Sequence, residues 1–364
     1  MEKKTSLKKV IPVILVTVIV VTAVLAFVQK LVMPKYQTSS PEGSMIEEYY
    51  DEYGENDVIF FGDCEVYEVF SPVTLWEEYG ITSYVRGTAQ QLVWMSYYYM
   101  EETLKYEKPK VMVFAVNSLM YGSPDGTKDD RNREAYNRMS FDGMRWSAQK
   151  WRSINVSMTT EEREKSGVWS YVFPILRFHD RILELTGEDI EYLFKKEKVT
   201  DRGYLMQVSV EPMTADYSAP PLVDYTFSDL CIEYLDRMVS LCAENDIRLV
   251  FVKSPTKYPV WYDEYEEQIE EYTKDNDILY INLLECEEDY GINWQTDTYD
   301  AGLHPNVYGV EKISGYFGRF LMDNCDLEDH RKDGELSDTW EDICEAYHAR
   351  KAALEEREAQ KENN

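Results

Sequence analysis

Five short apolar runs stand out along the chain, and longer segments with a helical pattern separate them. The runs are rich in β-branched and aromatic residues, which are typical of strands. They lie at Val58–Phe61, Ile81–Val85, Lys110–Val116, Arg248–Lys253 and Ile278–Leu283. Near-continuous apolar strands that alternate with helices predict an α/β fold, a doubly wound parallel sheet that is covered by helices on both faces.

The third and fourth runs are separated by about 130 residues, which is too long for a single crossover connection. Part of this segment, residues 161–196, has the pattern of two or three helices. We therefore predict that a helical cap is inserted at about residues 130–215, beside the sheet. The α/β domain itself is expected to cover residues 51–325, and the charged tail at 326–364 is expected to end in an exposed helix.

The N-terminal region contains an uncharged stretch of 20 residues, Val10–Gln29, long enough to cross the hydrocarbon layer of a bilayer. Four lysines precede this stretch and only two follow closely, which favours a cytoplasmic N-terminus and an exported body. A cleaved signal peptide is the alternative, but the apolar run exceeds the usual length and no clear cleavage site follows it. We predict a cytoplasmic segment at 1–9, a transmembrane anchor at 10–32 and a polar linker at 33–50.

The net charge of the chain limits the classes of partner that it can bind. It has 38 basic and 68 acidic residues and a formal net charge of −30. The basic surface that neutralises phosphates is therefore missing, and no nucleic-acid partner is expected. The six cysteines show no C-x-x-C pair and no metal-ligand spacing, and phosphate loops and dinucleotide fingerprints are absent. We expect no cofactor and no metal.

Candidate functional residues follow each predicted strand. Ligands of a doubly wound sheet bind beyond the carboxyl ends of its strands, so residues at these positions share one edge. In strand order they are Asp63 and Cys64, then Gly87, then Asn117, then Lys253, and finally Asp300 and His304 in the stretch "DAGLHPNVYG".

These motifs resemble those of the SGNH (GDSL-like) hydrolase superfamily, over roughly residues 57–320. The matching positions are Gly62-Asp63-Cys64, Gly87, Asn117, and Asp300 with His304. The resemblance implies that Cys64 attacks an ester carbonyl, that His304 is the general base and that Asp300 orients its imidazole. It also implies an oxyanion hole formed by the backbone N–H groups of Cys64 and Gly87 and the side chain of Asn117.

Two positions depart from the family pattern. Cys64 stands where the family has serine, and Asp300 precedes His304 by four residues instead of three. Cys64 is therefore either the nucleophile or a small apolar filler of the turn, since free cysteine is often buried. The carboxylate that orients His304 is either Asp300 or Asp297.

Two further residues are candidate substrate contacts. Lys253 ends a strand at the proposed active edge and can contact an anionic or carbonyl group, or it is simply a surface lysine. Arg145 lies in "NRMSFDGMRWS" just before the cap, where it would form a rim for a sugar. Aromatic residues make up 14% of the chain, which suits stacking on carbohydrate.

Two functions remain open from the sequence. The first is an extracytoplasmic, membrane-anchored esterase or O-acyltransferase that acts on acylated polysaccharides of the cell envelope. The second is a catalytically inactive relative that binds glycans or assists an integral-membrane acyltransferase. The distance between the Cys64 sulfur and the His304 imidazole is the observation that separates them.

Overall fold

The computed structural model describes residues 7–34, 42–122, 132–195 and 198–362. Most of the predicted cytoplasmic segment and part of the predicted linker lie outside these residues. The chain forms two compact units. The first combines the N-terminal segment with residues 160–198, and the second contains residues 41–159 and 199–364.

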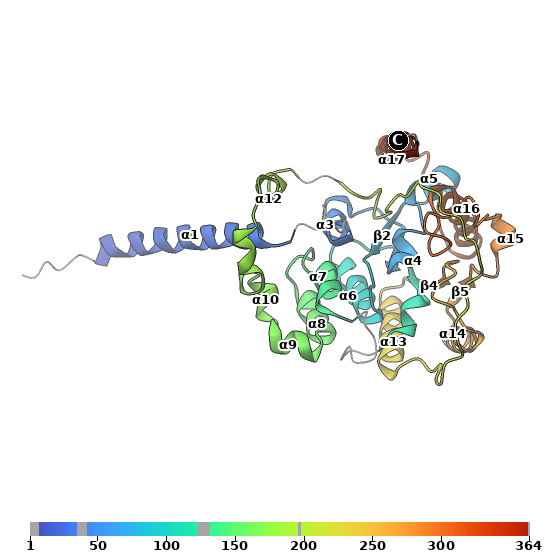
Figure 1. Ribbon diagram of the computed structural model, residues 1–364, viewed down its shortest axis with the longest axis horizontal. Coiled ribbons are helices and arrows are strands. Elements are labelled where there is room, and N and C mark those ends of the chain that lie inside the picture. The colour runs from blue at the N-terminus through green and yellow to red at the C-terminus, as the bar shows by residue number, and fades with distance from the viewer. Residues whose placement is uncertain (1–6, 35–41, 123–131, 196–197, 363–364) are drawn as a thin grey trace, which may run out of the picture. The chain divides into compact units, whose positions relative to one another are not determined.

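The second unit is built on a five-stranded parallel sheet (Figure 1). Its strands are β1 (Val58–Gly62), β2 (Ser83–Gly87), β3 (Val111–Ala115), β4 (Arg248–Lys253) and β5 (Leu279–Asn282). All five predicted strands are confirmed, although the second begins two residues later than its apolar run. The order β2-β1-β3-β4-β5 is that of a flavodoxin-like sheet.

Helices cover both faces of this sheet, which confirms the predicted fold class. Helix α5 packs against α16, and α6 packs against α13. Right-handed crossovers place α5 and α6 on opposite faces, because β2 and β3 lie on opposite sides of β1. The helices of this unit are α3 (Glu42–Glu52), α4 (Cys64–Tyr67), α5 (Pro72–Tyr79), α6 (Val93–Thr103), η1 (Val116–Met120), α7 (Glu134–Phe141), α8 (Ala148–Ser157), α13 (Asp229–Glu244), α14 (Asp263–Asp275), α15 (Glu287–Tyr290), α16 (Val307–Asn324) and α17 (Gly334–Glu362).

The core on the α5 side is aromatic. Phe60 of β1 stacks on Phe70 with ring centroids 4.7 Å apart, and Phe317 of α16 lies 5.0 Å from Phe70. All three side chains are fully buried. This packing fixes the segment that follows β1 against α16, so it positions two segments that are far apart in sequence.

The first unit is helical. It contains α1 (Leu7–Val32), α9 (Thr160–Lys165), α10 (Trp169–Val172), α11 (Ile175–Phe178), η2 (His179–Leu183) and α12 (Gly187–Tyr192). The part of α1 from Val10 to Val32 is long and apolar enough to cross a membrane, by length and composition. The helical insertion between β3 and β4 is thus confirmed, but it is divided: α7 and α8 belong to the sheet unit, and α9 to α12 belong with α1.

Two boundaries differ from the sequence-based expectation. The predicted linker at 33–50 overlaps α3, whose Met45, Ile46 and Tyr49 are buried. The tail is not simply exposed: Trp340 of α17 stacks on Trp76 at 5.0 Å, and Tyr347 is buried. Trp340 and Tyr347 are seven residues apart and share one helix face, an apolar stripe that the high charge of the segment conceals.

Candidate active site

The turn after β1 presents Cys64 at the carboxyl edge of the sheet. Asp63 caps the short helix α4, because its side chain accepts a hydrogen bond of 3.1 Å from the backbone N–H of Glu65. Cys64 is the first residue of α4 and is partly exposed, while it also packs against the core.

Gly87 ends the neighbouring strand at the same level. Gly62 and Gly87 are register partners in the parallel pair of β1 and β2. A Cβ atom on Gly87 would lie 2.9 Å from a methyl group of Val66 and 3.0 Å from the carbonyl oxygen of Gly62. Only glycine lets β2 end this close to the Cys64 turn.

The loop after β5 joins Asp300 to His304. The imidazole Nδ1 lies 2.6 Å from Asp300 Oδ2, and the His304 backbone N–H donates to Asp300 Oδ1 at 2.7 Å. Ala301 and Gly302 adopt left-handed backbone conformations with φ of 61° and 95°. These two residues absorb the extra position, so a carboxylate four residues before the histidine still reaches its ring.

Asp297, the alternative partner, is engaged elsewhere. Its Oδ2 lies 2.6 Å from Lys312 Nζ and accepts a hydrogen bond of 2.8 Å from the backbone N–H of Asn293. These bonds lower the pKa of Asp297 even though burial opposes ionisation. The structure therefore pairs His304 with Asp300.

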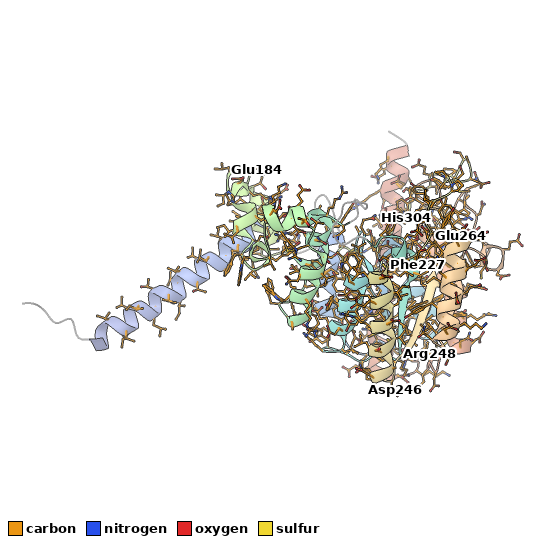
Figure 2. All side chains as sticks on the ribbon, turned by 90° about the horizontal axis from the view of Figure 1, so that it is seen from below. Glu184, Phe227, Asp246, Arg248, Glu264 and His304 are labelled. Carbon is orange, nitrogen blue, oxygen red and sulfur yellow. The ribbon has the colours of Figure 1, made fainter. Side chains whose placement is uncertain are left out.

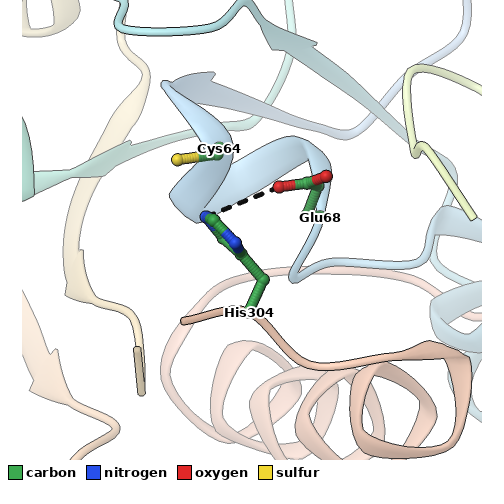
Figure 3. Close-up of side chains that lie close together, drawn as sticks. All are labelled: Cys64, Glu68 and His304. Atoms are coloured by element: carbon green, nitrogen blue, oxygen red, sulfur yellow. Dashed lines mark ion pairs between the residues drawn. The ribbon is translucent and has the colours of Figure 1, made fainter. Parts of the chain in front are cut away.

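His304 and Cys64 meet at the carboxyl edge. Figure 2 shows His304 at the end of the sheet opposite to Arg248, which begins β4. The Cys64 sulfur, a ring nitrogen of His304 and a carboxylate oxygen of Glu68 all lie within 4.8 Å of one another (Figure 3). Residues 240 positions apart along the chain are thus brought together by the packing of α4 beside the His304 loop.

Glu68 is a site residue that sequence reasoning missed. Its Oε2 lies 3.5 Å from His304 Nε2, the nitrogen that faces α4, and its Oε1 accepts a hydrogen bond of 2.7 Å from the Tyr299 hydroxyl. The available signal was spacing, because Cys64 and Glu68 are four residues apart and share one face of α4. Tyr299 also stacks along the His304 ring, with centroids 6.0 Å apart.

The surroundings of Cys64 favour the neutral thiol. Burial, followed by the negative charge of Asp63, raises the pKa of Cys64 to about 12. His304 opposes this shift and Glu68 adds to it. Burial, together with the charge of Glu65, also raises the pKa of Asp63 to about 7. Burial, and secondly the carboxylates at this edge, therefore favour the thiol over the thiolate at neutral pH.

Negative groups around His304 favour its charged form. Burial disfavours this charge, but the negative groups around the ring raise the pKa of His304 well above its usual value. Those groups are the Cys64 thiolate, when it forms, together with Asp300 and Glu68. The largest of the raising contributions comes from the thiolate, so a neutral thiol leaves only Asp300 and Glu68 to favour the imidazolium.

Lys253 is buried below the site and is not a surface lysine. Its ammonium lies 3.1 Å from Glu65 Oε2 and donates to the carbonyl oxygen of Ser254 at 2.7 Å. Both side chains of the pair are almost inaccessible to solvent. The anionic group that Lys253 contacts is therefore Glu65 of this chain. The ion pair holds the end of β4 against α4.

Asn117 lies at the carboxyl end of β3, whereas Arg145 packs among tyrosines. Asn117 lies in η1 directly after β3 and is buried, and its Oδ1 has no hydrogen-bond partner among the residues that the structure describes. Arg145 instead packs its guanidinium over the Tyr50 ring at 4.4 Å and close to Tyr106. The structure therefore brings Arg145 into a tyrosine network, not into the cluster around Cys64.

The cluster also has the composition of a metal site. A thiol, an imidazole and a carboxylate are the ligand types that zinc takes, and Cys64, His304 and Glu68 provide one of each within 4.8 Å. The hydrogen bond between Asp300 and the second imidazole nitrogen would orient such a ligand. The expectation of no metal stays a prediction.

The chain has few matches among known proteins. No family model matches the chain, and no curated protein matches it. Among solved structures, the chain is similar to a protein from Desulfitobacterium hafniense DCB-2 that is assigned provisionally to the lipolytic proteins of the G-D-S-L family. The identity is 13%, the TM-score is 0.36, and the match covers 73% of this chain and 99% of the other.

Proposed function

We propose that this chain is an enzyme that hydrolyses or transfers acyl esters through a thioester on Cys64. The observation that carries the proposal is the joining of Cys64, His304 and Asp300 at the carboxyl edge, with a 2.6 Å contact between Asp300 and His304 Nδ1. A nucleophile, a base and a group that orients the base are the parts that acyl transfer requires.

The chemistry needs His304 in its neutral form. The Cys64 thiol passes its proton to Nε2 of the neutral imidazole while the sulfur attacks the ester carbonyl carbon. His304 returns this proton to the departing alkoxide, which leaves as an alcohol, and the acyl group remains on sulfur as a thioester. Water or a second hydroxyl then attacks the thioester with His304 again as the base, and the thiol is regenerated.

Glu68 controls when this base is available. Its carboxylate faces Nε2 at 3.5 Å and favours the imidazolium, which cannot accept a proton. We therefore expect turnover to rise at alkaline pH, where the imidazole is neutral. The backbone N–H groups of Cys64 and Gly87 and the Asn117 side chain are the proposed oxyanion donors.

The proposed setting is the outer face of a membrane. Helix α1 is the proposed anchor, and the excess of lysines before it favours a cytoplasmic N-terminus and an extracytoplasmic sheet unit. An enzyme held there meets acylated polysaccharides of the cell envelope, which we propose as the substrate class.

A second candidate is a catalytically inactive module that binds glycans or assists an integral-membrane acyltransferase. The high pKa of Cys64, about 12, favours this alternative, because a neutral thiol is a poor nucleophile. Both candidates keep the same fold, and they differ in whether His304 affects the reactivity of Cys64.

The rate at which iodoacetamide alkylates Cys64, measured over a range of pH, distinguishes the enzyme from the inactive module. The wild type is compared with Cys64→Ala, which identifies the Cys64 phase, and with Cys286→Ala as a matched control at a partly exposed thiol. We expect the Cys64 rate to rise with pH, to fall in His304→Ala and to rise in Glu68→Gln, because these groups shift the thiol pKa in opposite directions. A Cys64 rate that is indifferent to both substitutions would contradict the enzyme and favour the module.

A further inference from the structure

The C-terminal end of α1 is packed against the short helices of its own unit. Helices α11 and η2 contact α1, and α10 and α12 lie beside the same end of it in Figure 1. Arg181 of η2 donates to the backbone carbonyl oxygens of Val32 at 2.9 Å and Met33 at 2.5 Å. These are carbonyls that the end of a helix leaves without an intrahelical partner. Residues 175–183 are thus fixed at the level where the apolar span ends.

Arg181 also holds α12 at this level. The second nitrogen of its guanidinium lies 3.1 Å from Asp189 Oδ1, and Asp189 in turn caps the first turn of α12 through the Thr186 backbone N–H at 2.9 Å. One arginine therefore joins the end of α1 to two of the short helices. The short helices are therefore held to the end of α1 by specific hydrogen bonds and an ion pair.

Large apolar side chains in this segment are exposed. Trp169 is 60% exposed, Leu183 is 92% exposed and Phe194 is 80% exposed. Trp169 stacks with Phe173, their ring centroids 6.4 Å apart. The complete set of exposed large apolar residues in this segment, which we call the apolar face, is Trp169, Phe173, Leu176, Ile182, Leu183, Ile190 and Phe194.

Arginines accompany the aromatic part of the apolar face. Arg177 and Arg181 follow Trp169 and Phe173 in the chain, while the acidic residues Glu184, Glu188, Asp189 and Glu191 come later, so residues 169–194 have a net charge of −3. Exposed tryptophan and phenylalanine with arginine close by are typical of the interface between lipid headgroups and acyl chains. Water is a poor solvent for so large an apolar face, which marks it as an interaction surface.

We propose that the apolar face lies in the headgroup interface of the leaflet where α1 leaves the membrane. Packing against the last turn of α1 places the face at this depth, and its aromatic and aliphatic side chains fit the boundary of the acyl chains. The short helices then form a second membrane contact that fixes how the first unit is oriented on the bilayer. This inference rests on the proposed role of α1 as an anchor.

Quenching of tryptophan fluorescence by brominated lipids tests the depth. The full chain is reconstituted in nanodiscs with lipids brominated either near the headgroup or near the end of the acyl chain, and wild type is compared with Trp169→Phe. Trp146→Phe is the matched control, because Trp146 is also exposed but belongs to the sheet unit. A second reporter, Leu183→Trp in the Trp169→Phe background, covers a failure of either single variant to fold.

The expected result is that shallow bromines quench the wild type more than Trp169→Phe, that deep bromines show a smaller difference, and that Trp146→Phe behaves as wild type. Stronger quenching by deep bromines would overturn the interfacial position. Absence of any difference that depends on residue 169 or 183 would overturn the lipid contact and leave a protein partner as the occupant. Failure of the chain to enter nanodiscs would instead contradict the anchor itself.

Discussion

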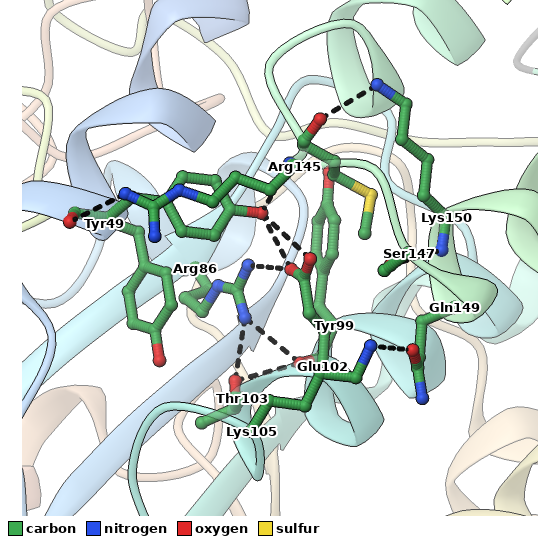
Figure 4. A network of polar contacts seen from close by, with 12 residues as sticks. Tyr49, Arg86, Tyr99, Glu102, Thr103, Lys105, Arg145, Ser147, Gln149 and Lys150 are labelled. Carbon is green, nitrogen blue, oxygen red and sulfur yellow. Dashed lines mark hydrogen bonds and ion pairs between the residues drawn. The ribbon is translucent and has the colours of Figure 1, made fainter. Parts of the chain in front are cut away.

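Two of the clusters of buried charge in the sheet unit are built in opposite ways. Around Arg86, the guanidinium meets Glu102 at 2.8 Å, and neither side chain is accessible to solvent (Figure 4). The ring of Tyr49 covers the guanidinium at 3.8 Å, and the hydroxyl of Tyr50 donates to the same carboxylate. One positive and one negative group balance, and aromatic rings and hydroxyls complete the shell.

The cluster around Cys64 is unbalanced. It contains four carboxyl groups, those of Asp63, Glu65, Glu68 and Asp300, against Lys253 and His304. Burial, followed by a neighbouring carboxylate, raises the pKa values of the Cys64 thiol and of Asp63, whereas the negative groups around His304 overcome burial and raise its pKa. A buried pair of equal and opposite charges is expected to be rigid. A buried cluster with an excess of carboxyl groups binds protons instead, and a change of pH or a bound substrate can release them.

Removal of the thiol is the largest change expected at the unbalanced cluster. Cys64→Ala should lower kcat/KM for an activated ester by roughly 10³-fold or more, because the nucleophile is lost and only the surrounding hydrogen-bond donors remain. Steady-state hydrolysis measures the loss, with Cys286→Ala as the control. Unchanged hydrolysis in Cys64→Ala would place the reaction at another residue.

Removal of the positive partner is the largest change expected at the balanced cluster. Arg86→Met should lower the free energy of unfolding by about 3–5 kcal/mol, because Glu102 is left buried without its partner. Denaturant unfolding measures the effect. The double variant Arg86→Met/Glu102→Leu should recover part of it, and a double variant as unstable as the single one would show that packing, not unpaired charge, causes the loss.

The pH dependence of stability sharpens the contrast. Asp63 has a pKa of about 7 in the folded chain, above its usual 3.8, so the folded state holds a proton that the unfolded state releases. The free energy of unfolding should therefore fall as pH rises from about 4 to about 7, by a contribution on the order of 3 kcal/mol. Asp63→Asn, which keeps the helix cap, should flatten this slope. An unchanged slope would show that other groups cause it.

Substitution of Glu68 is expected to have the smallest effect, and one that is confined to the reactivity of Cys64. Glu68→Gln should raise the alkylation rate of Cys64 at pH 8 by roughly threefold to tenfold, because a negative charge that disfavours the thiolate is removed. Glu267→Gln, on the exposed face of α14, is the matched control and should leave the rate unchanged. Equal acceleration in both variants would indicate a general effect of net charge.

The sequence predicted the sheet well because β1 to β4 are almost entirely buried and most of their residues are apolar. It also predicted that Cys64 and His304 share an edge, since residues that follow parallel strands do so whatever their separation along the chain. The α17 packing was missed because Trp340 and Tyr347 are diluted by charged neighbours. The burial of Lys253 depends on its pairing with Glu65, which lies far from it in the chain, and no local pattern contains that information. The role of Glu68 had a local signal, its four-residue spacing from Cys64, but that spacing alone does not show that Glu68 reaches His304.

Trapping of the acyl-enzyme tests the central claim most directly. The full chain is mixed with an activated acetyl ester, quenched in acid within the first turnover and mapped by mass spectrometry of its peptides. The account predicts one acetyl group per chain, on Cys64, sensitive to hydroxylamine as a thioester is, and strongly reduced in His304→Ala. Acetyl groups that are absent from Cys64, or that form on it equally well in His304→Ala, would contradict it.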